Sequence, residues 1–219
     1  MKNFLITIFF IVNGIFVPAQ NNTVVDIDSN VYHTVTIGRQ VWMVENLRTA
    51  RYRNGDPIHY VTMTPEWINL TSGACCDYDN TISNGENYGK LYNWYAVNDN
   101  RKIAPEGWHV PSAAEWDTLI TYLGGEKIAG GKLKEKGNHH WLNPNTGATN
   151  ESGFTALPGG NRYFSGQFLQ QGIFGFWWSS TRYSSGYAYF ISLNHEEKGL
   201  GYYKFLKWNG GLSVRCVKN

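Results

Sequence analysis

The 219-residue sequence has little charge, and the charge that it has is almost balanced. Lysine and arginine contribute 19 residues and aspartate and glutamate 17, which gives a formal net charge of +2. Proteins that bind nucleic acid through its phosphates carry a basic excess that is clustered on one face or along one helix. We therefore expect no nucleic-acid partner for this chain.

Cysteine is also rare, because only Cys75, Cys76 and Cys216 are present. No C-x-x-C or paired-histidine spacing of a zinc site accompanies them, and the adjacent His139 and His140 would point in opposite directions along an extended chain. We expect no metal and no other cofactor. An odd number of cysteines leaves one thiol unpaired, while Cys216 could bridge to either of the other two in an exported protein.

Only one long apolar run occurs, and it begins at the N-terminus as "MKNFLITIFFIVNGIFVPAQ". A lysine, an apolar segment and a Val-Pro-Ala sequence are the three parts of a secretory signal peptide. The run is interrupted by Asn-Gly and is short for a bilayer-spanning helix, which needs about 20 apolar residues, although a membrane anchor is the alternative. We predict that residues 1–19 are a signal peptide and that the domain of residues 20–219 is exported to the periplasm, the cell surface or the medium.

Aromatic residues and glycine are abundant, with nine Trp, fourteen Tyr and 24 Gly. This composition favours short strands joined by turns over a helical bundle. The alternation of residues 31–37, "VYHTVTI", predicts a strand in an N-terminal β-meander. Further strands are expected near residues 154–157, 174–180, 187–193, 201–208 and 212–218. With no linker or repeat in the chain, we predict one α+β domain.

Two helices are predicted in the middle of the chain. Ser112 and Glu115 have the spacing of a capping box, and apolar residues at i, i+3, i+4 and i+7 predict a helix of about eleven residues that ends at Gly124. A second short helix from Glu126 is weakened by a Gly-Gly pair. His109, just before the first helix, is interpreted as a packed histidine because no catalytic partner is placed beside it.

Residues 50–103 are harder to interpret. Thr64 followed by proline predicts a helix start, residues 75–89 a polar loop, and residues 90–97 a short helix or strand. The acidic side chains of that loop, Asp77, Asp79 and Glu86, could hold calcium, but a solvated loop is the simpler interpretation. The pattern of residues 26–30 imitates the start of an EF-hand loop without its required glycine and glutamate, so it predicts a turn.

Six motifs occur in order: "VTIGRQVWMVENLRTARY", "LYNWYAV", "APEGWHVPSAAEW", "NESGFTALPGGNR", "WWSST" and "LSVRCVK". Together they resemble the Fibrobacter succinogenes major paralogous domain of secreted and surface bacterial proteins. The resemblance implies a C-type-lectin-like fold, related to the formylglycine-generating-enzyme branch. In such a fold one or two short helices flank twisted antiparallel sheets, and the N- and C-terminal strands lie close together.

Two positions depart from the pattern of that family. Ala104 stands where many members have a cysteine, which excludes a disulfide from that position to Cys216. Cys75 stands where an aromatic residue is common, next to the more usual Cys76. On this resemblance, we expect any disulfide to join Cys76 to Cys216.

The function that we expect is a non-catalytic binding module that recognises a glycan or a surface protein through its C-terminal loops. Tyrosine and tryptophan offer rigid contact area with a polar tip. The stretch from Phe176 to Ser180 is predicted to be a core strand with Trp177 or Trp178 facing inward. The candidate ligand-binding residues follow it and are Tyr183, Tyr187, His195, Tyr202, Tyr203, Trp208 and Asn209.

Three other functions are weighed against this one. Calcium-dependent sugar binding is disfavoured because Gly210 stands where calcium-binding lectins have an aspartate. A structural or self-assembling surface component without a small ligand has the same sequence features as a binding module. An enzyme is disfavoured because Cys216 is expected on a buried strand and Ser179-Ser180 lacks the flanking glycines of a nucleophile elbow, so we expect no catalytic residues.

Overall fold

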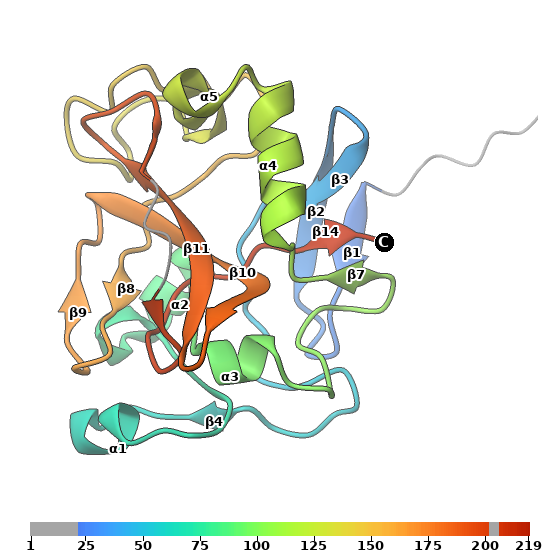
Figure 1. Cartoon of the computed structure of the whole chain (residues 1–219), viewed down its shortest axis with the longest axis vertical. Helices are drawn as coiled ribbons and strands as arrows, with labels where there is room; N and C mark the ends of the chain where they lie inside the picture. The colour runs from blue at the N-terminus through green and yellow to red at the C-terminus, as the bar shows by residue number, and fades with distance from the viewer. Residues whose placement is uncertain (1–21, 202–205) are drawn as a thin grey trace, which may run out of the picture.

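The computed structural model describes residues 22–201 and 206–219, so the predicted signal peptide lies outside the described residues. Within them, the chain forms a mixed α+β fold of mainly antiparallel sheets with five short α-helices (Figure 1). The predicted α+β class is therefore confirmed. None of the helices found in this part of the chain is long and apolar enough to cross a membrane.

The helices of the described residues are α1 (Thr64–Ile68), α2 (Ile82–Tyr88), α3 (Trp94–Val97), α4 (Ala113–Tyr122) and α5 (Glu126–Leu133).

Four sheets contain the strands of the described residues. The first sheet has the order β1 (Thr23–Val25), β2 (Val31–Ile37), β3 (Gln40–Met43), β14 (Val217–Lys218) and β7 (Trp108–His109). The second contains β10 (Phe174–Ser184) and β11 (Tyr187–Asn194), with β12 (Leu200–Gly201) and β13 (Leu206–Lys207) both paired to β11. The third is β4 (His59–Tyr60), β5 (Ala74–Cys76) and β6 (Leu91–Tyr92), and the fourth is β8 (Asn161–Arg162) with β9 (Phe168–Leu169).

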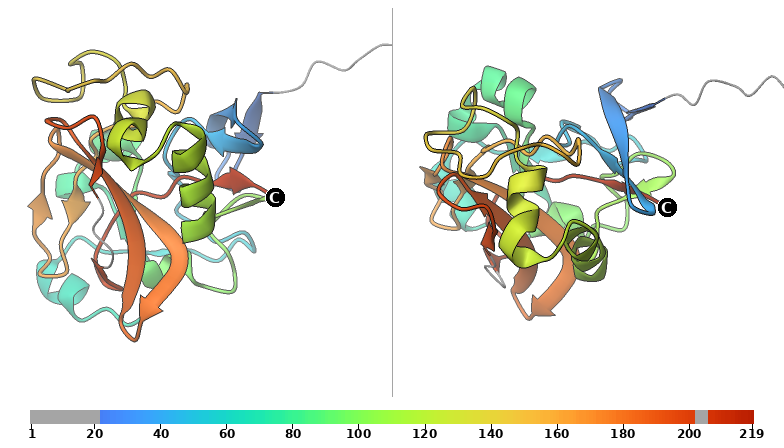
Figure 2. Two further views of the ribbon diagram at one scale, coloured as in Figure 1. Left: turned by 45° about the horizontal axis from the view of Figure 1, so that its top comes forward. Right: turned by 90° about the horizontal axis from the view of Figure 1, so that it is seen from above.

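In the view of Figure 1 the β10–β11 hairpin runs down the middle and separates two groups of elements, and Figure 2 shows the same hairpin from two further directions. Helix α4 and the first sheet lie on one side of it, and the β8–β9 hairpin lies on the other. Strand β14 pairs with β3, which places Val217 opposite Trp42. The N- and C-terminal strands therefore lie close together, as expected.

Both tryptophans in the middle of β10 are fully buried, although the sequence led us to expect only one to face inward. Trp177 belongs to the same buried cluster as Trp42 and Trp116, and the rings of the latter two lie 4.6 Å apart. Trp178 belongs to another cluster, and its indole N–H donates to the carbonyl oxygen of Tyr92 at 2.7 Å. Adjacent strand residues face opposite sides of a sheet, so both faces of β10 are covered here.

The predicted capping box is present at the start of α4. The Ser112 hydroxyl accepts from the Glu115 backbone N–H at 3.3 Å, and the Ser112 N–H donates to the Glu115 carboxylate at 2.8 Å. Gly124 follows the helix with φ of 102°, a left-handed conformation that favours glycine. The helix therefore begins and ends as its local sequence indicates.

The glycine pair in α5 has a packing role that the sequence did not reveal. A Cβ atom on Gly130 would collide with the carbonyl oxygen of Gly199. The Gly131 N–H donates to the carbonyl oxygen of Lys198 at 2.7 Å. These glycines weaken the helix but allow the segment between β11 and β12 to approach it closely.

The side chains of β2 do not follow the simple alternation of the sequence. The strand itself is confirmed, but Val31 and His33 are exposed and Tyr32 is fully buried. The Tyr32 hydroxyl donates to the Asp26 carboxylate at 2.6 Å and accepts from the Arg48 N–H at 2.9 Å. Burial with both hydrogen bonds satisfied explains why tyrosine rather than valine faces inward.

Three local predictions were wrong. The expected polar loop of residues 75–89 contains buried β5 residues and helix α2. Residues 154–157 form no strand, although Ala156 makes an isolated bridge with Lys134. Of residues 212–218, only the last two are in a strand, and Leu212 and Ser213 make single bridges. In the last two segments, Phe154, Ala156, Leu212, Val214 and Cys216 are buried by tertiary contacts rather than by continuous pairing with a neighbouring strand.

Three cations are fully buried in the described chain, and each holds loop segments together. Lys134 donates to the carbonyl oxygens of Thr146, Asn194 and Glu197. Arg162 donates to the carbonyl oxygens of Val61, Thr62 and Gly166. Arg215 donates to the carbonyl oxygen of Phe154 and to the side-chain oxygen Oδ1 of Asn46. Buried polar groups in a loop-rich fold need such partners because their segments lack complete sheet pairing.

Candidate functional site

The described residues among those predicted to bind a ligand do not form one surface. Tyr183 and Tyr187 lie at the closed end of the β10–β11 hairpin, where Tyr183 is 45% exposed. His195 follows the opposite end of β11, which places it about 25 Å from Tyr187 at the usual rise of a strand. Tyr202 and Tyr203 lie outside the described residues.

Trp208 is a packing residue in this structure. Its ring stacks on Trp94 with 5.1 Å between ring centroids, and Tyr95 meets its edge at 5.5 Å. The Arg182 guanidinium lies 5.2 Å from the ring centroid, and the backbone N–H of Trp208 donates to Gly186. These contacts use the ring to anchor the end of the hairpin, so little of it is left as a platform for a ligand.

His195 and Asn209 also make structural contacts. The His195 side chain is 14% exposed, and its Nδ1 lies 2.9 Å from the carbonyl oxygen of Asn143. The Asn209 side-chain amide donates to the carbonyl oxygen of Ile68 at 3.2 Å. Of the predicted site residues that are described, the exposed Tyr183 is the best placed to meet a partner.

The expected Cys76–Cys216 disulfide is not present. Cys75, Cys76 and Cys216 are free, buried thiols. Cys76 and Cys216 belong to different clusters of buried side chains, so the fold does not bring their sulfur atoms together. Burial raises the pKa of both Cys75 and Cys76 to about 12, which makes them inert thiols rather than nucleophiles.

The acidic loop residues form no calcium site in the described chain. Asp77 is buried, and its two oxygens meet the Lys90 ammonium at 2.8 Å and the Tyr60 hydroxyl at 2.9 Å. Residues 22–201 and 206–219 contain no group of three or more His, Cys, Asp or Glu side chains that could hold a metal ion. Asp77 therefore acts as the partner of a lysine and a tyrosine.

His109 lies at a junction between α4 and the C-terminus. Its Nε2 is 2.7 Å from the Glu115 carboxylate and its Nδ1 is 2.7 Å from the side-chain oxygen of Asn219. Burial alone would raise the pKa of Glu115, but hydrogen bonds from Ser112 and His109 hold this pKa below its usual value. Because both ring nitrogens are occupied, His109 joins structural elements and has no nitrogen left to activate a nucleophile.

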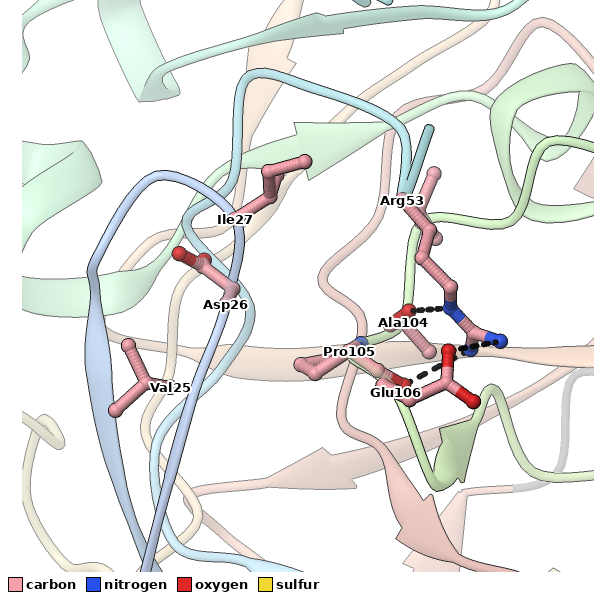
Figure 3. Close-up of a pocket in the computed structure, with 8 residues that line it drawn as sticks. Val25, Asp26, Ile27, Arg53, Ala104, Pro105 and Glu106 are labelled. Atoms are coloured by element: carbon pink, nitrogen blue, oxygen red, sulfur yellow. Dashed lines mark hydrogen bonds and ion pairs between the residues drawn. The ribbon is translucent and has the colours of Figure 1, made fainter. Parts of the chain in front are cut away.

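A cavity lies between the β1–β2 turn and the loop before β7, and Figure 3 shows the residues that line it. Its volume is about 320 Å³. Arg53 turns its guanidinium toward that loop, where it donates to the Ala104 carbonyl at 3.0 Å and lies 3.5 Å from the Glu106 carboxylate. Across the cavity, Asp26 accepts hydrogen bonds from its own turn and from Tyr32. The charged groups of this cavity are thus used to hold the two loops.

A second cavity, also of about 320 Å³, lies between the β8–β9 hairpin and strands β10, β11 and β13. We call it the neutral pocket because the described residues that line it carry no charge. They are Asn161, Tyr163, Leu169, Gln170, Phe176, Phe190, Leu206 and Leu212. Phe176 and Phe190 are buried and meet edge to face, while Tyr163 and Leu169 are 36% and 39% exposed. The pocket therefore combines apolar walls with two amides and a phenol, the composition of a small-ligand site.

Residues 35–218 match the model of the Fibrobacter succinogenes major domain. The chain belongs to this family. The recognition made from six ordered motifs is therefore confirmed, and this bacterial family of paralogous domains covers nearly the whole described structure. No curated protein and no solved structure matches the chain.

The neutral pocket of this Fibrobacter succinogenes major domain was missed in the sequence. Asn161 lies in the "NESGFTALPGGNR" motif, Phe176 begins the stretch that was predicted to be a core strand, and Phe190 lies in the strand expected near residues 187–193. These segments were therefore recognised in the sequence. Their contact in the folded protein depends on how the β8–β9 hairpin packs beside the sheet of β10 and β11, which no local sequence pattern specifies.

Proposed function

We propose that this domain is an exported, non-catalytic binding module with a C-type-lectin-like arrangement, and that it recognises a glycan through the neutral pocket. The observation that carries the proposal is the pocket itself, whose described walls are apolar and uncharged and whose hydrogen-bonding groups are neutral. Sugar rings have apolar C–H faces and hydroxyl edges, which match such a lining. A charged ligand would have to lose its hydration without a counter-charge.

The position of the pocket supports binding by the C-terminal part of the chain. Phe176, Phe190 and Leu206 come from the long hairpin and the strand beside it. The volume of about 320 Å³ lies at the small end of the range for ligand sites and suits one ring-sized group. The exposed rim residues Tyr163 and Leu169 leave room for further units of a chain outside the pocket.

The chemistry of the described groups favours binding over catalysis. The lining of the neutral pocket contains neither a nucleophile beside a base nor a pair of carboxylates. The thiols are buried with raised pKa values, and both nitrogens of His109 are occupied. We therefore propose direct recognition by amide, phenol and apolar groups without a metal.

The proposal is tested with the mature protein, residues 20–219, on a glycan array with and without EDTA. We expect binding of neutral glycans that survives EDTA. Leu169→Arg places a charge at the rim of the pocket and should abolish binding, whereas Leu142→Arg changes a leucine that is 53% exposed elsewhere and should not. Equal binding by both variants, or binding lost with EDTA, would refute the proposal. A Tyr183→Ala variant tests whether the end of the hairpin contributes.

A surface or matrix assembly component is the second candidate function. Val25, Ile27 and Val31 are 53%, 45% and 48% exposed and lie together at the β1–β2 turn. An exposed apolar group of this kind is a possible contact between copies. Elution of the mature protein as a large species on gel filtration, reversed by Ile27→Lys, would favour this function over a monomeric binding module.

A further inference from the structure

We propose that Asn161 is a specificity-determining residue of the neutral pocket and that its side-chain oxygen accepts a hydrogen bond from a hydroxyl group of a neutral sugar ring. This inference rests on the proposed function. Asn161 is 5% exposed, and its Oδ1 atom is buried without a hydrogen-bond partner among the described residues. A buried acceptor without a partner destabilises the folded protein, so it calls for a functional explanation.

The position of Asn161 relative to the pocket distinguishes it from other buried polar groups. Five other side-chain atoms are buried without a partner in the described chain, and none of their residues lines the neutral pocket. Asn145 is the nearest chemical equivalent, because its Oδ1 also lacks a partner. Its side-chain nitrogen, however, donates to the carbonyl oxygens of Glu135 and Gly137 and so ties a loop together. Among the described residues, Asn161 alone combines an unpaired oxygen with a place in the pocket wall.

The residues on both sides of Asn161 are held in place by the fold. Gly160 has φ of 64°, and a Cβ atom there would meet backbone atoms of Leu169 and Gln171. On the other side, the buried Arg162 guanidinium donates to the carbonyl oxygens of Val61 and Thr62 at 2.6 and 2.9 Å. The residue is thus fixed between a glycine with a required conformation and an anchored arginine. A residue whose backbone is held in advance loses less freedom when a ligand binds.

The chemistry of the ligand follows from the oxygen and its surroundings. The oxygen needs a donor, and the apolar walls need an apolar body of ring size. A leucine or phenylalanine side chain of a partner protein would fill the pocket but leave the oxygen unpaired, so it would not relieve the destabilisation that an unpaired buried acceptor causes. A sugar ring supplies a hydroxyl donor and apolar C–H groups in one unit. The absence of charge among the described lining residues disfavours acidic and amino sugars.

The inference predicts opposite effects on stability and binding. Asn161→Leu removes the unpaired oxygen and keeps a similar volume, so we expect the melting temperature to stay the same or rise. The same variant should bind sugar about tenfold more weakly, the effect of losing one hydrogen bond of about 1.4 kcal/mol. Asn161→Asp keeps an acceptor in place and should bind more tightly than Asn161→Leu. Asn69→Leu, the same change at an exposed asparagine, should leave the Kd unchanged.

The experiment measures binding of methyl glycosides of glucose, galactose, mannose and N-acetylglucosamine by calorimetry and ligand-observed NMR, together with N-acetylphenylalaninamide as a peptide probe. For the glycoside that binds best, the monodeoxy forms are then compared on wild type and Asn161→Leu. One missing hydroxyl should weaken binding to wild type about tenfold and have no effect on the variant, because the two changes remove the same contact.

The outcomes separate this inference from the proposed function. If no glycoside and no peptide probe binds, the proposed function fails and the inference fails with it. If a glycoside binds, loses affinity in Leu169→Arg and keeps its affinity in Asn161→Leu, the binding function stands and the role of Asn161 is refuted. Binding of the peptide probe alone would retain a binding pocket and refute its assignment to sugars.

Discussion

Substitution of Asn46 by alanine should destabilise the protein by about 4 kcal/mol, because one amide oxygen holds two core side chains. Asn46 Oδ1 accepts from the Trp177 indole at 2.8 Å and from the Arg215 guanidinium at 3.0 and 2.7 Å. The Asn46 nitrogen donates to the carbonyl oxygen of Tyr88 at 2.7 Å. Arg215 is fully buried, with its guanidinium 4.2 Å from the centroid of the Phe154 ring.

The magnitude follows from what the alanine variant leaves behind. Removing one partner of a buried charge costs about 3–5 kcal/mol, and a lost neutral hydrogen bond costs about 1 kcal/mol. The total is less than the sum because the contacts share one oxygen and the core can relax. In an Arg215→Met background, the buried charge is gone, so the Asn46→Ala change should cost only about 2 kcal/mol.

Equilibrium unfolding in urea, followed by tryptophan fluorescence, measures these free energies. Asn69→Ala is the matched control, because the Asn69 side chain is exposed and donates to the Pro65 carbonyl at 2.7 Å. We expect this control to change the free energy of unfolding by about 0.5 kcal/mol or less. If Asn46→Ala unfolds at the same midpoint as the control, or costs the same with and without Arg215, the proposed role of the oxygen is wrong. Asn46→Asp, which keeps an acceptor, provides a folded comparison if the alanine variant is insoluble.

Three further predictions concern groups with perturbed pKa values. The pKa of Glu115 is lower in the folded protein than in the unfolded chain, so Glu115 stabilises the fold above its unfolded pKa and this contribution is lost as the pH falls. Glu115→Gln should therefore lower the free energy of unfolding by about 1 kcal/mol at neutral pH and make that free energy less dependent on pH between about pH 5 and pH 3. Burial lowers the pKa of Lys134 to about 8, below its unfolded value of about 10.4, so its contribution should make stability rise from about pH 8 to pH 10. That rise should be absent in Lys134→Met, because methionine has no group that titrates in this range. Cys75, Cys76 and Cys216 should resist a thiol reagent in the folded protein near pH 8, because all three thiols are buried. After unfolding in guanidinium chloride without reductant, all three should react. Fewer than three reactive thiols in the unfolded protein would indicate a disulfide.

Features predicted correctly from the sequence depend on neighbouring residues. The capping box, the apolar face and the terminal glycine of α4 act within a few positions of one another, and so do the turns around β10 and β11. Strand β2 was also predicted correctly as a strand, although not in which of its side chains face inward. Membership of the family also follows from ordered motifs in the sequence. The α+β class could be inferred because helix and strand periodicities differ along the chain.

The candidate site could be predicted only in outline. The sequence indicated that the C-terminal third carries the aromatic surface, and this third supplies Phe176, Phe190 and Leu206 to the neutral pocket. It did not indicate that Trp208 would stack on Trp94 inside the fold. Nor did it indicate that His195 would lie beyond the opposite end of β11 from Tyr187. The identity of an aromatic residue does not show whether it packs in the core or binds a ligand, because its neighbours in the folded structure determine its role.

The sequence by itself determined helix α4, strands β2, β10 and β11, the family and the balance of strands over helices. Tertiary structure alone decided which cations became buried anchors and which polar atoms were left without a partner. Lys134, Arg162 and Arg215 would be surface residues by their usual preference, and they are buried because backbone carbonyls from distant segments converge on them. Apolar side chains from distant segments likewise meet at Asn161 and form the walls of the neutral pocket. Hydrogen bonding inside a protein depends on contacts between segments far apart in the chain, and these exist only once the chain has folded.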